Sequence, residues 1–250
     1  MKTPGVYIIE KNAFPNSVVE VATAIPAFIG HTQFARDGNK DLTGIPFRIS
    51  SMAEFHSFFG FAPTLRFGIR PEDSESEDTT NDINVLFPDG SCQLTLPKTF
   101  YALYYNMLLF YANGGGPCYI VSVGDYEHDF KSIDFTNALL ALKKEQEPTL
   151  VVVPEAVYME EGDCYKVQTA ALMHCGNDMK NRFAILDVFN GYKDENGAVI
   201  KSFRENIGSN FLAYCASYYP WINTSIVTEK DITFYNIEKF ISEKTKAFSS

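Results

Sequence analysis

Residues 99–123, TFYALYYNMLLFYANGGGPCYIVSV, decide the fold. Between Phe100 and Tyr111 only Asn106 is clearly polar, so this stretch predicts a helix that is apolar on every side. Such a helix is either buried on several sides or spans a membrane, and its length of roughly a dozen residues is well short of the ~20 needed to cross a bilayer. We therefore expect this helix to be buried inside a domain.

A glycine-rich turn and a strand follow the helix. Asn113 and the run GGG at 114–116 tolerate positive φ and end the helix, and Pro117 prevents it from resuming. Residues 118–123 are β-branched and apolar, which is typical of a central strand covered on both faces. A buried helix and a buried strand together require further layers of structure around them.

The rest of the chain alternates short apolar runs with amphipathic stretches. This β-α-β-α-β order predicts an α/β fold, with a mostly parallel sheet and helices on both faces. Ser51 and Glu54 have the spacing of a capping box at the start of the first helix. Gly176 and Asn177 predict the end of another. Strands are predicted at residues 24–30, 47–49, 150–153, 183–188 and 211–218, and helices at 52–59, 134–146, 158–175, 202–207 and 237–248.

Residues 61–98 have a different character. The run PEDSESED at 71–78 combines repelling charges with no apolar periodicity, which predicts a solvated loop. Its acidic groups lack the spacing and the glycine of an EF-hand, so we expect no calcium site. Pro88, Asp89 and Gly90 then predict a turn between extended runs at 83–87 and 92–96. The region is therefore expected to be a surface insertion that contains a hairpin.

Composition excludes several classes of partner. The chain has 250 residues, of which 46% are hydrophobic, enough to fill a core. Its net charge of -10 argues against binding a phosphate backbone or an anionic membrane surface. The odd number of scattered cysteines, with no apparent leader or spanning run, predicts reduced thiols and synthesis in the cytoplasm. The cysteines are Cys92, Cys118, Cys164, Cys175 and Cys215.

Familiar catalytic and cofactor motifs are missing from the sequence. The glycine cluster at 114–116 lies between a helix and a strand and no lysine follows it, whereas a phosphate loop runs from strand to glycines to helix. Cys164, His174 and Cys175 lack the paired spacing of zinc ligands, and a nucleophilic pair using Cys175 would need a proximity that sequence cannot show. We therefore expect no catalytic residue, no cofactor and no metal.

Two further kinds of residue have more than one reading. Asp187 ends a predicted strand, where α/β proteins place ligand-binding residues, although an acid that caps a turn is the simpler interpretation. His31, His56 and His128 have no evident partners in the sequence. The rings in YYPW at 218–221 fit either a core or a contact between subunits.

The first residues contain little that would fold alone. After Pro4 and Gly5, residues 6–9 form a short strand-like run, which Asn12 and Pro15 interrupt. One interpretation is a frayed terminus. The other is a strand that joins the sheet of another chain, in which case buried apolar side chains must offset an ordering cost of ~1–2 kcal/mol per residue.

Three groups of residues have the order and approximate spacing found in one protein family. They are the helix, ANGGG turn and strand at 99–123, the start TPGVYIIE at 3–10, and RFAILD at 182–187 followed by FR at 203–204 and YYPW at 218–221. Together they resemble contractile tail sheath proteins, which form the sheaths of phage tails and of phage-tail-like injection systems.

The resemblance implies a structural, non-enzymatic subunit that polymerises around an inner tube and contracts to drive the tube through a target envelope. It implies identical sheath subunits, an inner tube protein, and baseplate and terminator proteins as partners, with no nucleic acid and no membrane insertion. It also implies assembly in the bacterial cytoplasm and a final place in a virion tail or injection particle. The residues expected to link subunits by strand exchange are Pro4, Gly5, Val6, Tyr7, Ile8 and Ile9.

The expected organisation is an extended arm at 1–22, a body formed by 23–60 and 99–234, the insertion at 61–98 and a terminal helix at 235–250. Sheath proteins usually continue into a C-terminal domain, which this sequence does not show. A fragment, a short or split sheath component, and a baseplate or terminator protein with a sheath-like body are the open alternatives. An α/β enzyme or ligand-binding protein that uses strand ends at Gly124, Pro154 or Asp187 is the competing class, and a deep polar pocket would distinguish it.

Overall fold

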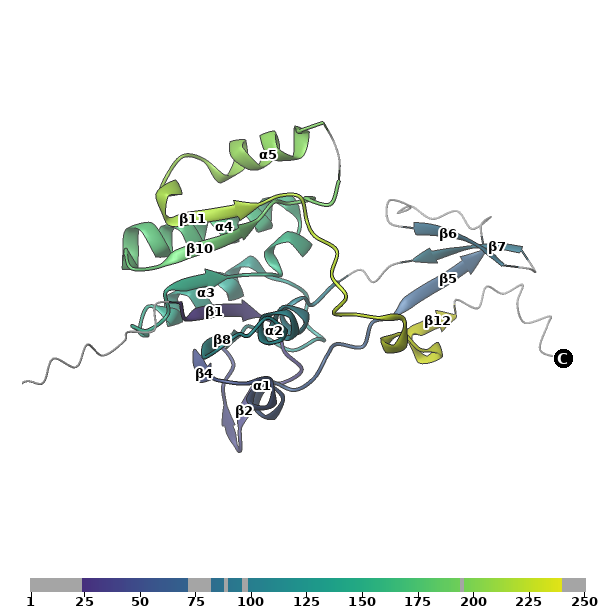
Figure 1. The fold of residues 1–250 in the computed structure, drawn as a ribbon, viewed down its shortest axis with the longest axis horizontal. Helices are drawn as coiled ribbons and strands as arrows, with labels where there is room; N and C mark the ends of the chain where they lie inside the picture. The colour runs from purple at the N-terminus through teal and green to yellow at the C-terminus, as the bar shows by residue number, and fades with distance from the viewer. Residues whose placement is uncertain (1–23, 72–81, 88–89, 96–98, 194–195, 240–250) are drawn as a thin grey trace, which may run out of the picture.

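The computed structural model describes residues 24–71, 82–87, 90–95, 99–193 and 196–239 of the chain. The expected arm residues 4–9 and most of the acidic run at 71–78 lie outside these ranges. Within the described part, a larger α/β body and a smaller sheet stand apart, and the segment after the last strand of the body leads from one to the other (Figure 1).

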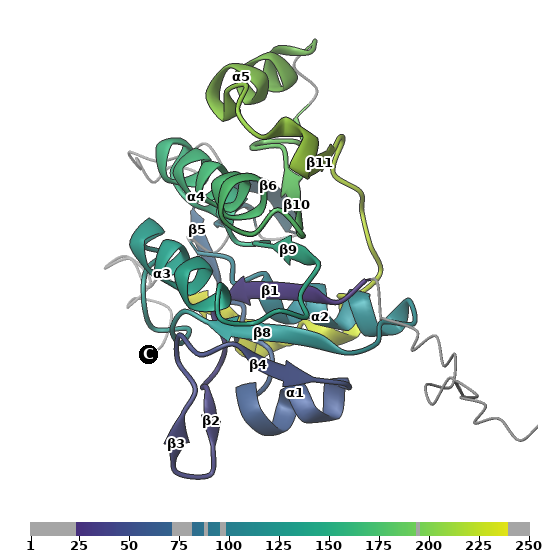
Figure 2. The ribbon, with the colours of Figure 1, turned by 90° about the vertical axis from the view of Figure 1, so that its left-hand side faces the viewer.

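A six-stranded sheet forms the centre of the body. Its strands are β1 (Pro26–Gly30), β4 (Phe47–Ile49), β8 (Cys118–Ser122), β9 (Leu150–Val152), β10 (Phe183–Asp187) and β11 (Cys215–Tyr218). Their order across the sheet is β11-β10-β9-β1-β8-β4, as Figure 2 shows from top to bottom. All neighbours are parallel except β4, which pairs antiparallel with β8. The predicted α/β fold with a mostly parallel sheet is therefore confirmed.

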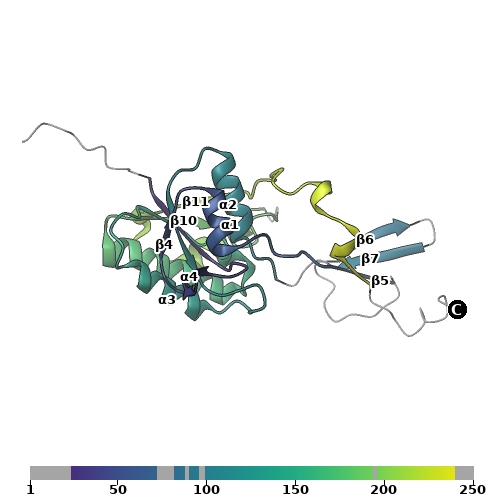
Figure 3. The same cartoon turned by 90° about the horizontal axis from the view of Figure 1, so that it is seen from below.

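Helices cover the two faces of this sheet. On one face lie α1 (Met52–Phe59) and α2 (Leu103–Ala112), and on the other lie α3 (Ser132–Leu142), α4 (Glu161–Met173) and α5 (Ala198–Ile207) (Figure 3). Side chains of the central strands alternate between the two layers. In β1, Ala27 and Ile29 join the core under α3 and α4, whereas Phe28 joins the core under α1 and α2.

The cap of α1 agrees with its sequence signal in a modified form. The Glu54 backbone N–H donates to Ser51 Oγ at 3.2 Å, as a capping box requires. The Glu54 carboxylate accepts from the backbone N–H of Ser50 at 2.7 Å, one residue earlier than expected. Buried Phe55 and Phe59 fix the helix against the core.

The smaller sheet has the order β12-β5-β7-β6, with β5 (Phe67–Pro71), β6 (Asp82–Phe87), β7 (Gly90–Thr95) and β12 (Ile237–Lys239). Strands β6 and β7 are antiparallel, which confirms the predicted hairpin. The helix predicted at 237–248 is wrong for its first three residues, because they pair in parallel with β5 as β12. The rest of that prediction lies outside the described residues. A short hairpin, β2 (Arg36–Asp37) and β3 (Lys40–Asp41), extends from the body.

Two predictions about helices are wrong in detail. The helix of α4 does not stop at Gly176 but continues through a π-helical turn, His174–Met179, and ends where Lys180 adopts a φ of 59°. Gly176 is needed for packing, because a Cβ there would lie 2.5 Å from Cβ of Phe211. In α2, only Leu103 and Met107 are fully buried, so the described residues do not bury this apolar helix on several sides.

The remaining boundaries shift by a few residues. Helix α5 starts at Ala198 instead of residue 202. Strand β11 starts at Cys215, after a 3-10 turn at Leu212–Tyr214 that had been included in the predicted strand.

Candidate functional site

The carboxyl ends of β1 and β9 meet at the point where the strand order reverses. Among the parallel strands, the chain passes from β1 to β8 on one side and then crosses to β9 on the other side of β1. Open α/β sheets bind ligands in the crevice at such a switch point. Here the crevice is occupied by His31, one residue after β1, and by Glu155, three residues after β9.

His31 and Glu155 form a buried hydrogen-bonded pair that also holds a helix. Glu155 Oε2 accepts from the backbone N–H of His31 at 2.9 Å and from His31 Nδ1 at 2.8 Å. Glu155 Oε1 accepts from the backbone N–H of Leu103, the first residue of α2, at 3.2 Å. The side chains are 1% and 0% exposed. The Glu155 carboxylate therefore links the end of β1 to the start of α2, and the His31 and Glu155 side chains occupy the crevice at the switch point.

The three histidines that lacked partners in the sequence each have one in the structure. His31 pairs with Glu155, His56 Nε2 lies 3.1 Å from the Tyr104 hydroxyl, and His128 Nδ1 lies 2.5 Å from Asp125 Oδ1. Nothing in the sequence linked these pairs. The one available signal was that Glu155 follows the buried run VVVP, so that it must lie at the carboxyl edge of a parallel sheet.

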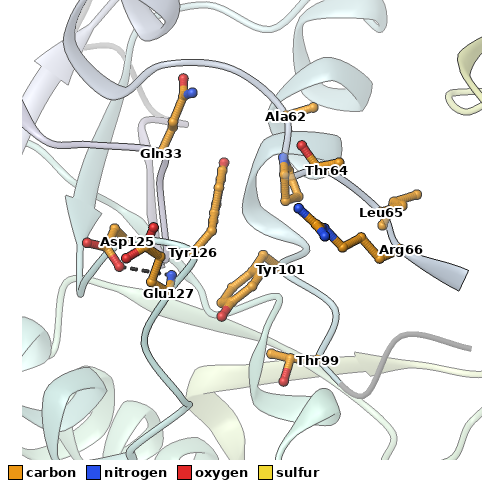
Figure 4. Close-up of a pocket in the computed structure, with 11 residues that line it drawn as sticks. Gln33, Ala62, Thr64, Leu65, Arg66, Thr99, Tyr101, Asp125, Tyr126 and Glu127 are labelled. Carbon is orange, nitrogen blue, oxygen red and sulfur yellow. Dashed lines mark hydrogen bonds between the residues drawn. The ribbon is translucent and has the colours of Figure 1, made fainter. Parts of the chain in front are cut away.

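A polar hollow of about 520 Å³ lies beside this edge, between the segment at 62–66 and the segment at 125–127 (Figure 4). Asp125 accepts from Glu127 N and His128 Nδ1, and these bonds hold the pKa of its carboxyl below its usual value. The Tyr126 hydroxyl donates to the Phe61 carbonyl at 2.9 Å, and the Tyr101 hydroxyl donates to the His128 carbonyl at 3.0 Å. The polar groups of Asp125, Tyr126 and Tyr101 therefore already form hydrogen bonds within the protein.

A larger hollow of about 710 Å³ lies on the α2 side of the sheet, beyond the ends of β9, β10 and β11. One wall is the side of α2 that carries Tyr105, Asn106 and Leu109, and the other is the segment at 218–227. Its floor includes Pro154 and Asp187, two of the three strand ends that the sequence marked for ligand binding. We call it the aromatic groove because Phe100, Tyr105, Tyr158, Tyr218, Tyr219 and Trp221 line it.

Trp221 is held rigidly at the rim of the aromatic groove. Its Nε1 donates to the Val188 carbonyl at 2.9 Å, and its backbone N–H donates to the Gly191 carbonyl at 3.0 Å. The rings of Tyr158 and Tyr192 lie 5.9 Å and 5.3 Å from it, centroid to centroid. The YYPW segment thus supplies a fixed ring to an accessible groove, not to the core alone.

Of the residues that the structure describes, Asp187 is the one acid that lines this groove. It ends β10 and lies in register with Tyr218 of β11, so the two side chains are neighbours on the same face. Among the described residues, no donor or cation pairs with its carboxylate, and partial burial raises its pKa. The Tyr158 pKa is raised to about 12, by desolvation and then by the Asp187 charge. With an acid set among aromatic rings, the groove resembles a recognition site.

The cysteine and histidine candidates lie elsewhere, in the core under α4. Burial raises the thiol pKa of Cys164 and of Cys175 to about 12, so both are protonated and unreactive at neutral pH. Burial and then the Arg182 charge lower the His174 pKa to about 4, and its Nε2 accepts from Arg182 at 2.9 Å. Within the described residues, no three potential ligands gather closely enough to hold a metal ion. The structure therefore does not bring these residues together as a nucleophilic pair.

Comparison with known proteins adds no constraint. No protein-family model matches the sequence, and no curated protein sequence matches it. In the part of the chain that the structure describes, none of the helices has both the length and the apolar character needed to cross a bilayer. The case for a function therefore rests on the residues of this chain.

Proposed function

We propose that this protein is a structural subunit of a contractile sheath, which polymerises around an inner tube and contracts to drive the tube through a target envelope. The observation that carries the proposal is a half of the central sheet that the described helices leave uncovered on one face. Every residue of β1 and β8 is buried, whereas β10 alternates between buried and half-buried residues and β11 has no buried residue.

The uncovered half lies on the α2 side of the sheet. In β10, Ala184 and Leu186 belong to the core under α3 and α4, so Ile185 and Asp187 point to the opposite face. Parallel sheets are normally covered on both faces, and α1 and α2 cover only the β1, β8 and β4 half. An apolar helix that is itself half-buried borders the gap. A second protein chain that packs against α2 and β10 would complete both elements.

The filled switch point also supports a structural role. The crevice that a related architecture would use for a ligand is occupied by the His31–Glu155 pair. Glu155 Oε2 accepts from His31, and Glu155 Oε1 accepts from the first residue of α2. The sheath resemblance of the sequence supplies the particular assembly. Its partners would be identical subunits, the inner tube, and baseplate and terminator proteins, and the chain would be made in the bacterial cytoplasm before it joins a tail or injection particle.

Assembly of this kind requires open-ended contacts, in which one surface meets a different surface of the next copy. The α2 side of the sheet is one such surface, and the expected arm at residues 4–9 is the linking element. Rigid α/β bodies could then move past one another during contraction while the arms keep neighbours joined.

A pair of charge insertions tests the proposal. Leu109→Glu places a charge on the α2 side of the gap, and we expect it to abolish large assemblies while the helical circular dichroism of the body is retained. Leu140→Glu on α3 is the matched control, because Leu140 is 56% exposed on the covered side of the sheet. Sedimentation velocity measures both. Normal assembly of Leu109→Glu, or equal loss with Leu140→Glu, would contradict the proposal.

A further inference from the structure

The aromatic groove contains a charge that the described residues leave uncompensated. Asp187 is half-buried at the end of β10, and its carboxylate accepts no hydrogen bond and forms no ion pair within the described ranges. The described cations that form ion pairs in the body have other acids as partners. Lys143, for example, pairs with Asp178 at 2.7 Å. Partial removal of a carboxylate from water is unfavourable unless a cation or several donors approach it.

The rings around Asp187 favour a cation over a neutral donor. Tyr218 lies beside Asp187 in the strand register, is 65% exposed and lines the groove. Tyr158, Phe100 and Trp221 form a connected series, with Phe100 and Tyr158 centroids 5.0 Å apart. Aromatic faces attract cations through their quadrupole, and a carboxylate adds a full opposite charge at the same place.

We propose that the aromatic groove binds an arginine side chain presented by another protein chain. A guanidinium group is planar and weakly hydrated, so it can stack on a ring and offer two parallel N–H donors to a carboxylate, which an ammonium group cannot do. The net charge of -10 favours a basic partner in general. The apolar α2 wall and the open face of β10 continue from the groove, and they offer area for the residues that flank the arginine.

This inference does not require the sheath proposal, because binding is measured on the isolated chain. Trp221 is the single tryptophan of the sequence, so its fluorescence reports on the groove without a label. The probes are capped Leu-Arg-Leu, Leu-Lys-Leu and Leu-citrulline-Leu tripeptides, in which citrulline keeps the shape of arginine without its charge. Isothermal titration calorimetry serves as the second readout.

We expect saturable binding of the arginine peptide, with the citrulline peptide at least tenfold weaker and the lysine peptide between them. Asp187→Asn should weaken arginine binding at least tenfold, and Tyr218→Ala about two- to fivefold. Asp37→Asn, on the exposed β2–β3 hairpin, removes the same charge outside the groove and should leave binding unchanged. Equal binding of arginine and citrulline peptides, or no signal with any peptide by either method, would overturn the inference.

Stability separates recognition from a structural role for Asp187. Since its pKa is raised, the charged form is disfavoured in the folded state, and Asp187→Asn should be at least as stable as the wild type at neutral pH. Arginine binding should also weaken as the pH falls through the pKa of Asp187, because protonation removes the charge. A clearly destabilised Asp187→Asn that binds the arginine peptide normally would show that the acid serves the fold and would overturn the inference.

Discussion

Replacement of Glu155 by alanine should destabilise the fold more than any other single change at the carboxyl edge of the sheet. The carboxylate is 0% exposed and accepts from three N–H groups, two of His31 and one of Leu103. Each buried donor that is left without an acceptor costs about 1–3 kcal/mol, so the loss of Glu155, which serves three donors, should cost about 3–5 kcal/mol in total. At roughly 2–4 °C per kcal/mol for a chain of this size, the melting temperature should fall by about 6–20 °C.

The assay is thermal and urea unfolding followed by circular dichroism. Glu155→Gln should also be destabilised by roughly 1–3 kcal/mol, because its amide N–H₂ must face at least one of the same donors. Glu160→Ala is the matched control, since Glu160 is exposed at the start of α4 and its side chain makes no capping bond. The prediction is wrong if the free energy of unfolding of Glu155→Ala lies within about 1 kcal/mol of the wild-type value. It is also wrong if Glu155→Ala is as stable as Glu160→Ala.

Three further predictions concern the core under α4 and the arm. Arg182 donates to the carbonyls of Leu142 and Glu145 at the end of α3 and to His174, so Arg182→Met should lower the free energy of unfolding by roughly 2–4 kcal/mol in urea titrations. A result under 1 kcal/mol would count against this role. The pKa of His174 is about 4 in the folded state and 6.5 in the unfolded state. Its contribution to the free energy of unfolding, up to about 3 kcal/mol, is therefore fully present above pH 6.5 and is lost as the pH falls toward 4. His174→Gln keeps an acceptor but does not titrate, so it should reduce the loss of unfolding free energy between pH 6.5 and pH 4. An unchanged loss would show that other groups cause it. Deletion of residues 1–10 should abolish long assemblies in electron micrographs but leave the melting temperature of the body unchanged, and normal sheaths from the truncated chain would exclude the arm.

The centre of the fold could be predicted from the sequence because its strands are short, fully apolar runs. Strands β1 and β8 are buried on both faces, so a continuous apolar run such as CYIVS can be placed only at the centre of a sheet. The first helix could be placed for a different reason, since Ser51 and Glu54 satisfy its free N–H groups locally. Both signals lie within a few residues of the element that they specify.

The predictions are wrong where the structure of a segment depends on a residue or strand that is distant in the sequence. Residues 237–239 form a strand because β5, about 170 positions earlier, offers them an edge, and three residues carry no periodicity of their own. Gly176 reads as a helix stop, but the ring of Phe211 packs against its Cα and the helix continues. The apolar character of α2 predicts burial on several sides, but only Leu103 and Met107 of the helix are fully buried.

Only part of the candidate site could be predicted from the sequence. Strand ends at Pro154 and Asp187 were marked because parallel strands place their carboxyl ends at one edge, and the aromatic groove does include both. The third strand end, Gly124, precedes the polar hollow instead. The pairing of His31 with Glu155 spans 124 positions, and no local pattern encodes it.

We propose that copies of this chain cover one another along the open half of the sheet and build an extended assembly. Negative-stain electron microscopy of the purified chain, alone and mixed with the products of its neighbouring genes, shows whether they do. We expect tubes or stacked rings of uniform width. Discrete monomers under every condition would contradict it.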